Sequence, residues 1–345
     1  MAGKRLLGAR ASAPTLLLAL TLLSVLCPPT RWARASSMAN DLPQPRPTLE
    51  TSFVAPADVD PATVTLQAPH YVAFDPAAPP QPELFLYLGG FLATTADAKL
   101  IVQQAAASGY HAIGLSFAKP ANVPALCQAD PDEGCFEAER LAVIYGNDGA
   151  PLPVAAPDTM VNQLSKLLAY LDAHHPEQGW GAFLADGQLQ WAAIRLAGHS
   201  EGGTHAALIA RDHLVARLCV FESPLDLVGA PGGLRRLAPW IEAGGATPAE
   251  RIYGFRHAHT SSPSVLGFEA AWGLLGLEAF GPAVDVDTTA PPYGGSHELT
   301  TDATPAVLDD TPNLTHRSVV EDRLTPKTAT GEALFAPVWQ YACMS

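Results

Sequence analysis

The stretch from Ile194 to Gly203, IRLAGHSEGG, decides the fold, because it sets a Gly-X-Ser-X-Gly turn between an apolar run and a helix-like run. Ser200 lies at the centre of this turn, between Gly198 and Gly202. A serine on so tight a strand-to-helix turn has a strained backbone and an exposed hydroxyl, and a Cβ at the flanking glycines would collide with the neighbouring strand and helix. These residue types predict a nucleophile elbow.

The residues around the turn decide between an elbow and a chance match. In a chain with 28 glycines the bare five-residue pattern can occur by accident. Here the segment 191–197 before it (WAAIRLA) is short and apolar, and the segment 204–214 after it (THAALIARDHL) has apolar residues at helical spacing. Strand, elbow and helix follow one another as the motif requires, and we infer that Ser200 is a catalytic nucleophile.

The first 35 residues have the three parts of a secretory signal peptide. Three basic residues within the first ten are followed by the apolar run 14–27 (PTLLLALTLLSVLC) and by Ala33-Arg34-Ala35, a small-residue cleavage site. The apolar run is shorter than the roughly 20 residues that a membrane-spanning helix needs, which favours a signal peptide over a membrane anchor. We expect cleavage near Ser36 and a protein with no stable membrane anchor, located in the periplasm or secreted from the cell.

Charge and composition limit what the protein binds. The chain has 345 residues, 48% of them hydrophobic, and a formal charge of −14. Loss of residues 1–35 would remove five basic residues and no acidic ones, which takes the charge from −14 to −19. A strongly acidic surface repels nucleic acids and anionic membranes. We therefore expect no nucleic-acid partner, a neutral or cationic substrate, and a monomer.

Four cysteines follow the expected cleavage site. Cys127 and Cys135 bracket the short acidic loop QADPDEG, and in an oxidising compartment they are well placed for a local disulfide. Cys219 lies in the apolar run RLCVF, which predicts a buried core residue without a disulfide partner. No CxxC or HxxxH spacing points to a metal site, and no cofactor motif is present in the sequence.

The order of elements predicts a layered α/β domain. Residues 36–82 are rich in Pro, Asp and Ala and are expected to form an extended arm with edge strands, one of them at 62–66. From 83 to 345 strands alternate with helices, which is typical of a parallel sheet covered on both faces. The expected strands are 84–88, 111–117, 191–197, 216–221, 251–255 and 297–301, and the expected helices are 96–108, 159–174, 204–214 and 333–342.

The elbow and this order of elements resemble the α/β-hydrolase superfamily over most of residues 83–345. Within it the chain is similar to a little-described group of secreted bacterial serine hydrolases, in the segments LYLGGF, SGYHAIGLSF, AGHSEGGTHAALIA, HRSVVEDRLTP and APVWQY. The resemblance implies an eight-stranded, mostly parallel sheet and a triad in the chain order serine, acid, histidine. It also implies hydrolysis through an acyl-enzyme, most often of esters.

The resemblance directs the search for the groups that would activate Ser200. An imidazole must take the serine proton, and a carboxylate must fix the tautomer of that imidazole. Four histidines follow the late strands, namely His257, His259, His297 and His316. His316 is the preferred base, because the superfamily carries its base in such a polar loop between the last strand and the last helix. His297 remains the alternative, although it would open the last strand, at the wrong edge of the sheet.

The acid is expected after the strand 216–221. The superfamily more often carries it one strand later, but the segment that follows 251–255 (RHAHTSSPS) contains no carboxylate. Asp226, in FESPLDL, is therefore the predicted acid. Glu222 is set aside because it lies too close to the strand interior, and Asp322 is expected to brace the local loop beyond His316.

Two backbone N–H groups are predicted to bind the oxyanion of an acyl-transfer reaction. One belongs to Glu201, directly after the nucleophile, and the other to Phe91, in the Gly89-Gly90-Phe91 turn after the strand 84–88. The glycine pair could instead form a simple tight turn. The Phe91 ring is expected to line the acyl pocket, as the resemblance implies.

The sequence leaves three functions open. The favoured one is a carboxylic-ester hydrolase that uses Ser200, Asp226 and His316 on a small-molecule or polymeric ester. A peptidase or amidase could use the same triad, and a non-catalytic binding protein could use the same fold. The intact elbow favours catalysis, because a strained, exposed serine costs roughly 1–3 kcal/mol and a binding scaffold has no need of it.

Overall fold

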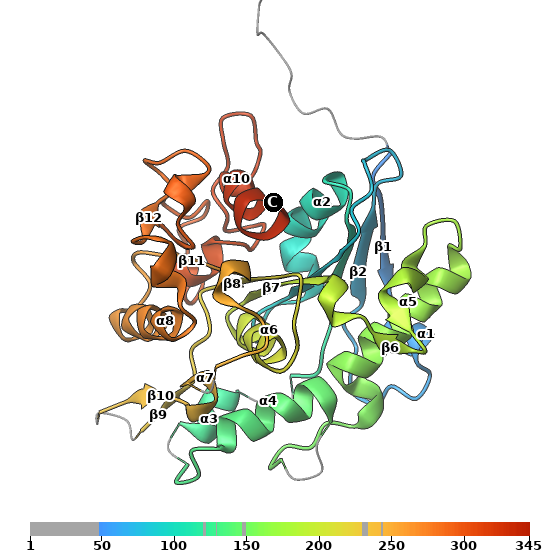
Figure 1. Cartoon of the computed structure of the whole chain (residues 1–345), viewed down its shortest axis with the longest axis horizontal. Helices are drawn as coiled ribbons and strands as arrows, with labels where there is room; N and C mark the ends of the chain where they lie inside the picture. The colour runs from blue at the N-terminus through green and yellow to red at the C-terminus, as the bar shows by residue number, and fades with distance from the viewer. Residues whose placement is uncertain (1–47, 120–121, 129, 147–149, 230–233, 243) are drawn as a thin grey trace, which may run out of the picture. The chain divides into compact units, whose positions relative to one another are not determined.

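The computed structural model describes residues 48–345, apart from 120–121, 129, 147–149, 230–233 and 243 (Figure 1). The expected signal peptide and residues 36–47 of the expected arm lie outside the described residues. Within the described ranges no helix is both long enough and apolar enough to cross a membrane.

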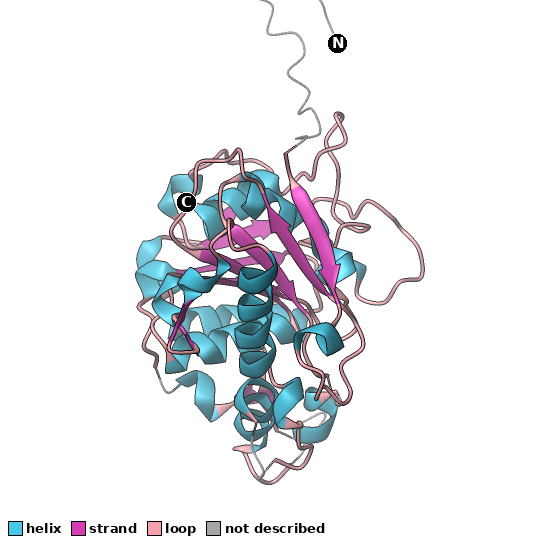
Figure 2. Ribbon diagram, turned by 90° about the vertical axis from the view of Figure 1, so that its right-hand side faces the viewer, coloured by secondary structure: helices cyan, strands magenta, loops and turns pink. Residues whose placement is uncertain are grey.

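A single large sheet forms the centre of the described chain (Figure 2). Among the described residues its strand order is β1 (Glu50–Val54), β2 (His70–Phe74), β4 (His111–Leu115), β3 (Leu84–Leu88), β7 (Ile194–His199), β8 (Arg217–Phe221), β11 (Ile252–His257), β13 (Glu298–Thr301) and β12 (Val284–Asp285). β2 runs antiparallel to both of its neighbours, and every other pairing in the sheet is parallel. The predicted mostly parallel sheet is confirmed, with one short edge strand, β12, beyond the eight strands that the resemblance implied.

Helices cover both faces of this sheet. Their bounds are α1 (Pro56–Val59), α2 (Lys99–Ala107), α3 (Val123–Cys127), α4 (Cys135–Tyr145), α5 (Met160–His174), α6 (Glu201–Asp212), α7 (Pro239–Glu242), α8 (Ser262–Leu274), α9 (Leu314–Ser318) and α10 (Ala336–Trp339). α4, α5, α6 and α8 pack on one face, and α2 and the C-terminal segment pack on the other (Figure 1).

β3 shows why the sheet needs two apolar cores. Leu84, Leu86 and Leu88 belong to the core under α4–α6, whereas Phe85 and Tyr87 belong to the core under α2. Side chains alternate between the two faces of a strand, so a strand with both faces covered is apolar throughout. The unbroken apolar run LFLYL therefore predicted correctly a strand in the middle of the sheet.

Some predicted elements differ from the structure. Residues 62–66 are not a strand, because the Asp158 carboxylate accepts hydrogen bonds from the N–H groups of Val64 and Thr65 and from the Thr65 hydroxyl. The helix predicted at 333–342 is a short α10 followed by a π-helical turn, Gln340–Met344. α4 was not predicted at all.

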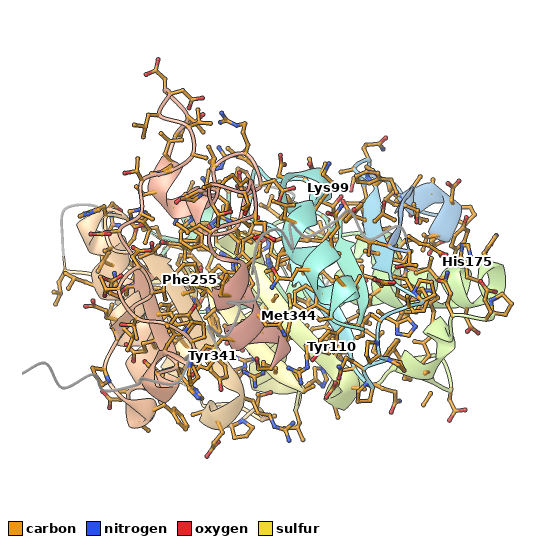
Figure 3. All side chains as sticks on the ribbon, turned by 90° about the horizontal axis from the view of Figure 1, so that it is seen from above. Lys99, Tyr110, His175, Phe255, Tyr341 and Met344 are labelled. Atoms are coloured by element: carbon orange, nitrogen blue, oxygen red, sulfur yellow. A yellow bond between two sulfur atoms is a disulfide. The ribbon has the colours of Figure 1, made fainter. Side chains whose placement is uncertain are left out.

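Two disulfides lie among the described residues. Cys127 and Cys135 form the predicted bond, with Cα atoms 5.4 Å apart, and it joins the end of α3 to the start of α4. The prediction for Cys219 was wrong in part: the residue is buried, but it forms a disulfide with Cys343. The C-terminal turn packs against β8, and the Tyr110 hydroxyl donates to the Met344 carbonyl at 2.8 Å. Both residues are labelled in Figure 3, where they lie next to each other. That packing brings the last cysteine to the sheet, which the local pattern RLCVF could not reveal.

Candidate active site

The nucleophile elbow has the predicted form. β7 ends at His199, α6 begins at Glu201, and Ser200 between them has a φ of 52° and a ψ of −116°. An added Cβ at Gly198 would lie 2.6 Å from the Gly202 backbone, and one at Gly202 would lie 2.2 Å from the Leu88 carbonyl oxygen. Both approaches are shorter than a carbon contact allows, so the glycines are required for α6 to pack so close to β3 and β7.

His316 lies at the same end of the sheet as the elbow. It belongs to α9, after β13, and it lines the cavity that contains Ser200. Its Nδ1 donates to the Glu222 Oε2 atom at 3.2 Å, and its backbone carbonyl accepts a hydrogen bond of 2.8 Å from His199 Nε2. A carboxylate on Nδ1 leaves the proton-free nitrogen at Nε2, the tautomer that a general base for a serine needs.

The carboxylate partner of His316 is Glu222, and the prediction of Asp226 as the acid was wrong. Glu222 follows the last residue of β8 and has a φ of 53°, which turns it out of the strand. Its side chain is fully buried, and its Oε1 atom accepts from the His257 N–H at 2.5 Å and from the Thr260 hydroxyl at 3.0 Å. The residue is therefore just past the strand end, although the sequence reasoning had set it aside as too close to the strand interior.

Asp226 is occupied elsewhere in the fold. Its two carboxylate oxygens accept hydrogen bonds from Arg140 at 2.9 and 3.3 Å, and one of them also accepts from the Trp240 indole at 3.0 Å. Arg140 donates in addition to Glu201 at 3.1 Å. A fully buried guanidinium needs such partners, so Asp226 neutralises Arg140 beneath the site and does not orient the base.

The other predicted alternatives lie away from the reacting groups. His297 precedes β13, where its Nδ1 bonds to the Ile252 carbonyl at 2.8 Å and its ring stacks on Tyr253 and Phe280. It is thus at the opposite end of the strand from the elbow. Asp322 accepts hydrogen bonds from the first two N–H groups of α2, so it caps that helix instead of bracing the His316 loop.

The loop after β3 lies against the nucleophile elbow. A Cβ on Gly90 would lie 3.1 Å from the His199 ring and 3.4 Å from the Ser200 Cβ, so only glycine fits there without displacement. Residues 90–93 form a turn closed by a hydrogen bond of 3.1 Å from the Ala93 N–H to the Gly90 carbonyl. Within the described chain the N–H of Phe91 donates no hydrogen bond. The N–H of Glu201 lies in the first turn of α6, where helical partners are lacking.

One cavity is lined by the elbow serine, by His316 and its carboxylate partner, and by the turn after β3. It has a volume of about 540 Å³. The predicted site residues that line it are Ser200, His316, Phe91 and Glu201, together with Glu222. Leu92, Pro124, Leu225 and Pro312 add apolar surface, and Asn122, Arg140, Ser264 and Arg317 add polar groups. Phe91 is thus among the lining residues, and the role of its ring in an acyl pocket stays a prediction.

Burial sets the charge state of the groups beneath the site. It lowers the pKa of His199 well below its usual value, so this imidazole is neutral, and it raises the pKa of Glu201 against the opposing effect of Arg140. Burial also lowers the pKa of the Lys119 ammonium to about 8. A neutral His199 donates through Nε2 to the His316 backbone and leaves its Nδ1 without a partner among the described residues.

Sequence reasoning missed Glu222, His199, Arg140 and Lys119 as parts of this site. Glu222 carried a usable signal, because it directly follows an apolar strand at the edge where the nucleophile lies. No cluster of three or more His, Cys, Asp or Glu side chains within the described part of the chain has a geometry suited to a metal ion.

The strand order, the elbow and the helices on both faces together define the architecture. The chain has the α/β-hydrolase fold. No protein-family model matches the sequence, and no curated protein is similar to it. Among solved structures it is similar to a double mutant of an esterase, with 15% identity, a TM-score of 0.41, and coverage of 86% of this chain and 84% of that one. It is also similar to a protein of Klebsiella pneumoniae subsp. pneumoniae provisionally named a dienelactone hydrolase, with 13% identity, a TM-score of 0.34, and coverage of 74% and 85%.

Proposed function

We propose that the protein is an exported serine hydrolase that cleaves carboxylic esters through an acyl-enzyme on Ser200. One observation carries this proposal: a strained serine, and a histidine whose Nδ1 is held by a buried carboxylate, line the same cavity. A binding scaffold gains nothing from a positive φ at Ser200, which costs roughly 1–3 kcal/mol. Two disulfides support an oxidising compartment as the place of action.

The proposed reaction begins with proton transfer. His316 Nε2 takes the proton of the Ser200 hydroxyl while the oxygen bonds to the ester carbonyl carbon. Glu222 holds the imidazolium that forms, and it keeps the proton on Nδ1. The N–H groups of Phe91 and Glu201 bind the negative oxygen of the tetrahedral intermediate, where one such donor is worth about 100-fold or more in rate.

The acyl-enzyme then forms and is hydrolysed. The C–O bond to the leaving alcohol breaks as His316 returns its proton to that alcohol. Water next loses a proton to His316 as its oxygen bonds to the acyl carbon. The bond from that carbon to Ser200 Oγ then breaks while His316 returns the proton to Oγ, which releases the carboxylic acid and restores Ser200. A cavity of about 540 Å³ with both apolar and charged walls suits a small ester, or the end of a polymeric one, better than a bilayer-forming lipid.

The test labels the folded protein with a fluorescent alkyl fluorophosphonate and follows the turnover of p-nitrophenyl esters of short and long acyl chain. We expect Ser200→Ala to lose both labelling and turnover. Ser52→Ala is the matched control, because this serine is exposed on the edge strand β1 and does not line the cavity, and it should keep both. A folded wild type that neither labels nor turns over esters would overturn the proposal and favour a binding protein. Cleavage of anilides with no cleavage of esters would favour the amidase.

A further inference from the structure

Lys119 holds the turn that faces the nucleophile. It follows β4, and its Nζ atom donates to the carbonyl oxygens of Gly90 at 2.5 Å and Ala93 at 2.6 Å. These are the first and last carbonyls of the 90–93 turn. The ammonium also lies 4.7 Å from the centre of the Phe117 ring. A single side chain therefore fixes both ends of a turn that carries a predicted oxyanion donor.

The peptide between Gly90 and Phe91 links this lysine to the reacting oxygen. The Gly90 carbonyl and the Phe91 N–H belong to one planar trans peptide, so they point in opposite directions from the same rigid unit. An ammonium on the carbonyl side sets the direction of the N–H on the other side. It also draws electron density toward the carbonyl oxygen, which makes the N–H a stronger donor.

We propose that Lys119 is a positioning residue for the oxyanion hole, which orients and polarises the Gly90–Phe91 peptide so that the Phe91 N–H binds the developing oxyanion. The inference rests on the proposed serine-hydrolase function and extends it. Lys119 is not among the residues that line the cavity, and it acts through the peptide. Its effect therefore belongs to the transition state, where the oxyanion forms, and not to the binding of the neutral ester.

The charges around Lys119 make its contribution depend on pH. Burial lowers the pKa of the ammonium, and the carboxylates of Glu201, Asp97 and Glu321 oppose that effect, with a resulting value of about 8. The imidazoles of His199 and His205 also face this charge, and burial keeps both neutral. The ammonium is thus present at neutral pH, and the positive charge behind the peptide is lost as the pH rises through about 8.

The wild-type protein gives the first readout without any substitution. We expect kcat to fall above a pH of about 8 as Lys119 loses its charge. In Lys119→Arg the charge persists to a pH above 12. That variant should keep a substantial kcat, and the fall on the alkaline side should disappear.

The second experiment removes the positive charge of Lys119 by substitution. We expect Lys119→Met to lower kcat per active site by roughly 10- to 100-fold, with a change in KM of less than about threefold, because losing an oxyanion donor outright costs about 100-fold or more. Active sites are counted by fluorophosphonate titration, so a lower yield of folded protein does not imitate this result. Lys166→Met is the control, because it removes the same charge from an exposed position on α5 and should leave kcat unchanged.

The outcomes separate this proposal from the one on which it rests. If wild type is inactive, the serine-hydrolase function fails, and the role of Lys119 fails with it. If wild type is active but Lys119→Met keeps its kcat per titrated site, Lys119 is only structural and the function stands. If Lys119→Met does not fold, the wild-type pH profile decides, and a kcat that stays level from pH 7 to pH 9.5 would overturn the proposal.

Discussion

Exchanging Glu222 for glutamine tests which carboxylate orients the base. Glutamine has the same shape, and its oxygen can keep the hydrogen bonds from the His257 N–H and the Thr260 hydroxyl. Its NH2 group then takes the place of the oxygen that faces His316 Nδ1. Two donors cannot share one hydrogen bond, so His316 must carry its proton on Nε2 and present a bare Nδ1 to the amide.

The fall in kcat expected for Glu222→Gln follows from the protonation of His316 on Nε2. A histidine protonated on Nε2 cannot take the proton of Ser200, and no carboxylate remains to stabilise the imidazolium. For a Ser-His-acid triad this exchange lowers kcat by about 10³- to 10⁴-fold, which corresponds to roughly 4–5.5 kcal/mol on the barrier. Stability should change less, because the two hydrogen bonds that anchor the buried side chain remain.

Asp226→Asn is the matched variant. It removes the charge that neutralises Arg140, so it should lower the free energy of unfolding by about 3 kcal/mol while kcat per titrated active site stays within about tenfold of wild type. The assay measures kcat for a short-chain p-nitrophenyl ester and the free energy of unfolding in urea for both variants. The opposite pattern, an active Glu222→Gln and an inactive, stable Asp226→Asn, would refute the assignment of Glu222 as the acid.

Three further predictions concern the fold. Gly202→Ala should give no folded protein, because the new Cβ would lie 2.2 Å from a backbone oxygen. Gly273→Ala on α8 is the control: its Cβ would have no atom within 4 Å, so this variant should be as stable as wild type or more stable by up to about 1 kcal/mol. Soluble yield and unfolding in urea compare the two variants. Replacing both Cys219 and Cys343 by alanine opens a link across 124 residues and should cost about 5 kcal/mol, against about 2.5 kcal/mol for the eight-residue Cys127–Cys135 link; equal losses in urea would contradict the loop-closure argument. Burial lowers the pKa of the His70 imidazole to about 4, against the opposing effect of the hydrogen bond to Gln163, and its Nδ1 accepts from the Ser116 N–H. The neutral form of His70 stabilises the fold fully above pH 6.5, and roughly 3 kcal/mol of the free energy of unfolding should be lost as the pH falls from 6.5 through 4. In a His70→Asn variant the free energy of unfolding should change less between those pH values.

Local patterns were enough to predict the layers of the fold. Spacing predicted the burial of the apolar run 84–88 and of the leucines of α5. The glycines of the elbow indicated that α6 approaches the neighbouring strands closely. The sequence also pointed to His316, because the resemblance directs attention to the polar segment between the last strand and the last helix, where the structure places this residue in α9. In each of these cases the residues that decide the structure are neighbours in the chain.

The acid and the second disulfide could not be predicted in this way, because both depend on contacts between distant segments. Glu222 directly follows an apolar strand, but the features that favour it over Asp226 are its backbone φ of 53° and the donors from residues 257 and 260, which the sequence around β8 does not show. Asp226 has the more familiar turn sequence, but its partner, Arg140, lies in a helix that was not predicted. Cys219 forms its disulfide with Cys343 because the C-terminal turn packs against β8.

The position of Glu222 has a consequence for how such a protein can diversify. With the carboxylate supplied at the end of β8, the segment between the end of β11 and the start of α8 contributes the His257 N–H and the Thr260 hydroxyl, which anchor Glu222, and no carboxylate. The following helix, α8, places Ser264 in the wall of the cavity. Mutations in α8 can therefore reshape substrate selection while the charge-bearing residues stay untouched, which makes this segment the natural region to randomise in a directed-evolution library.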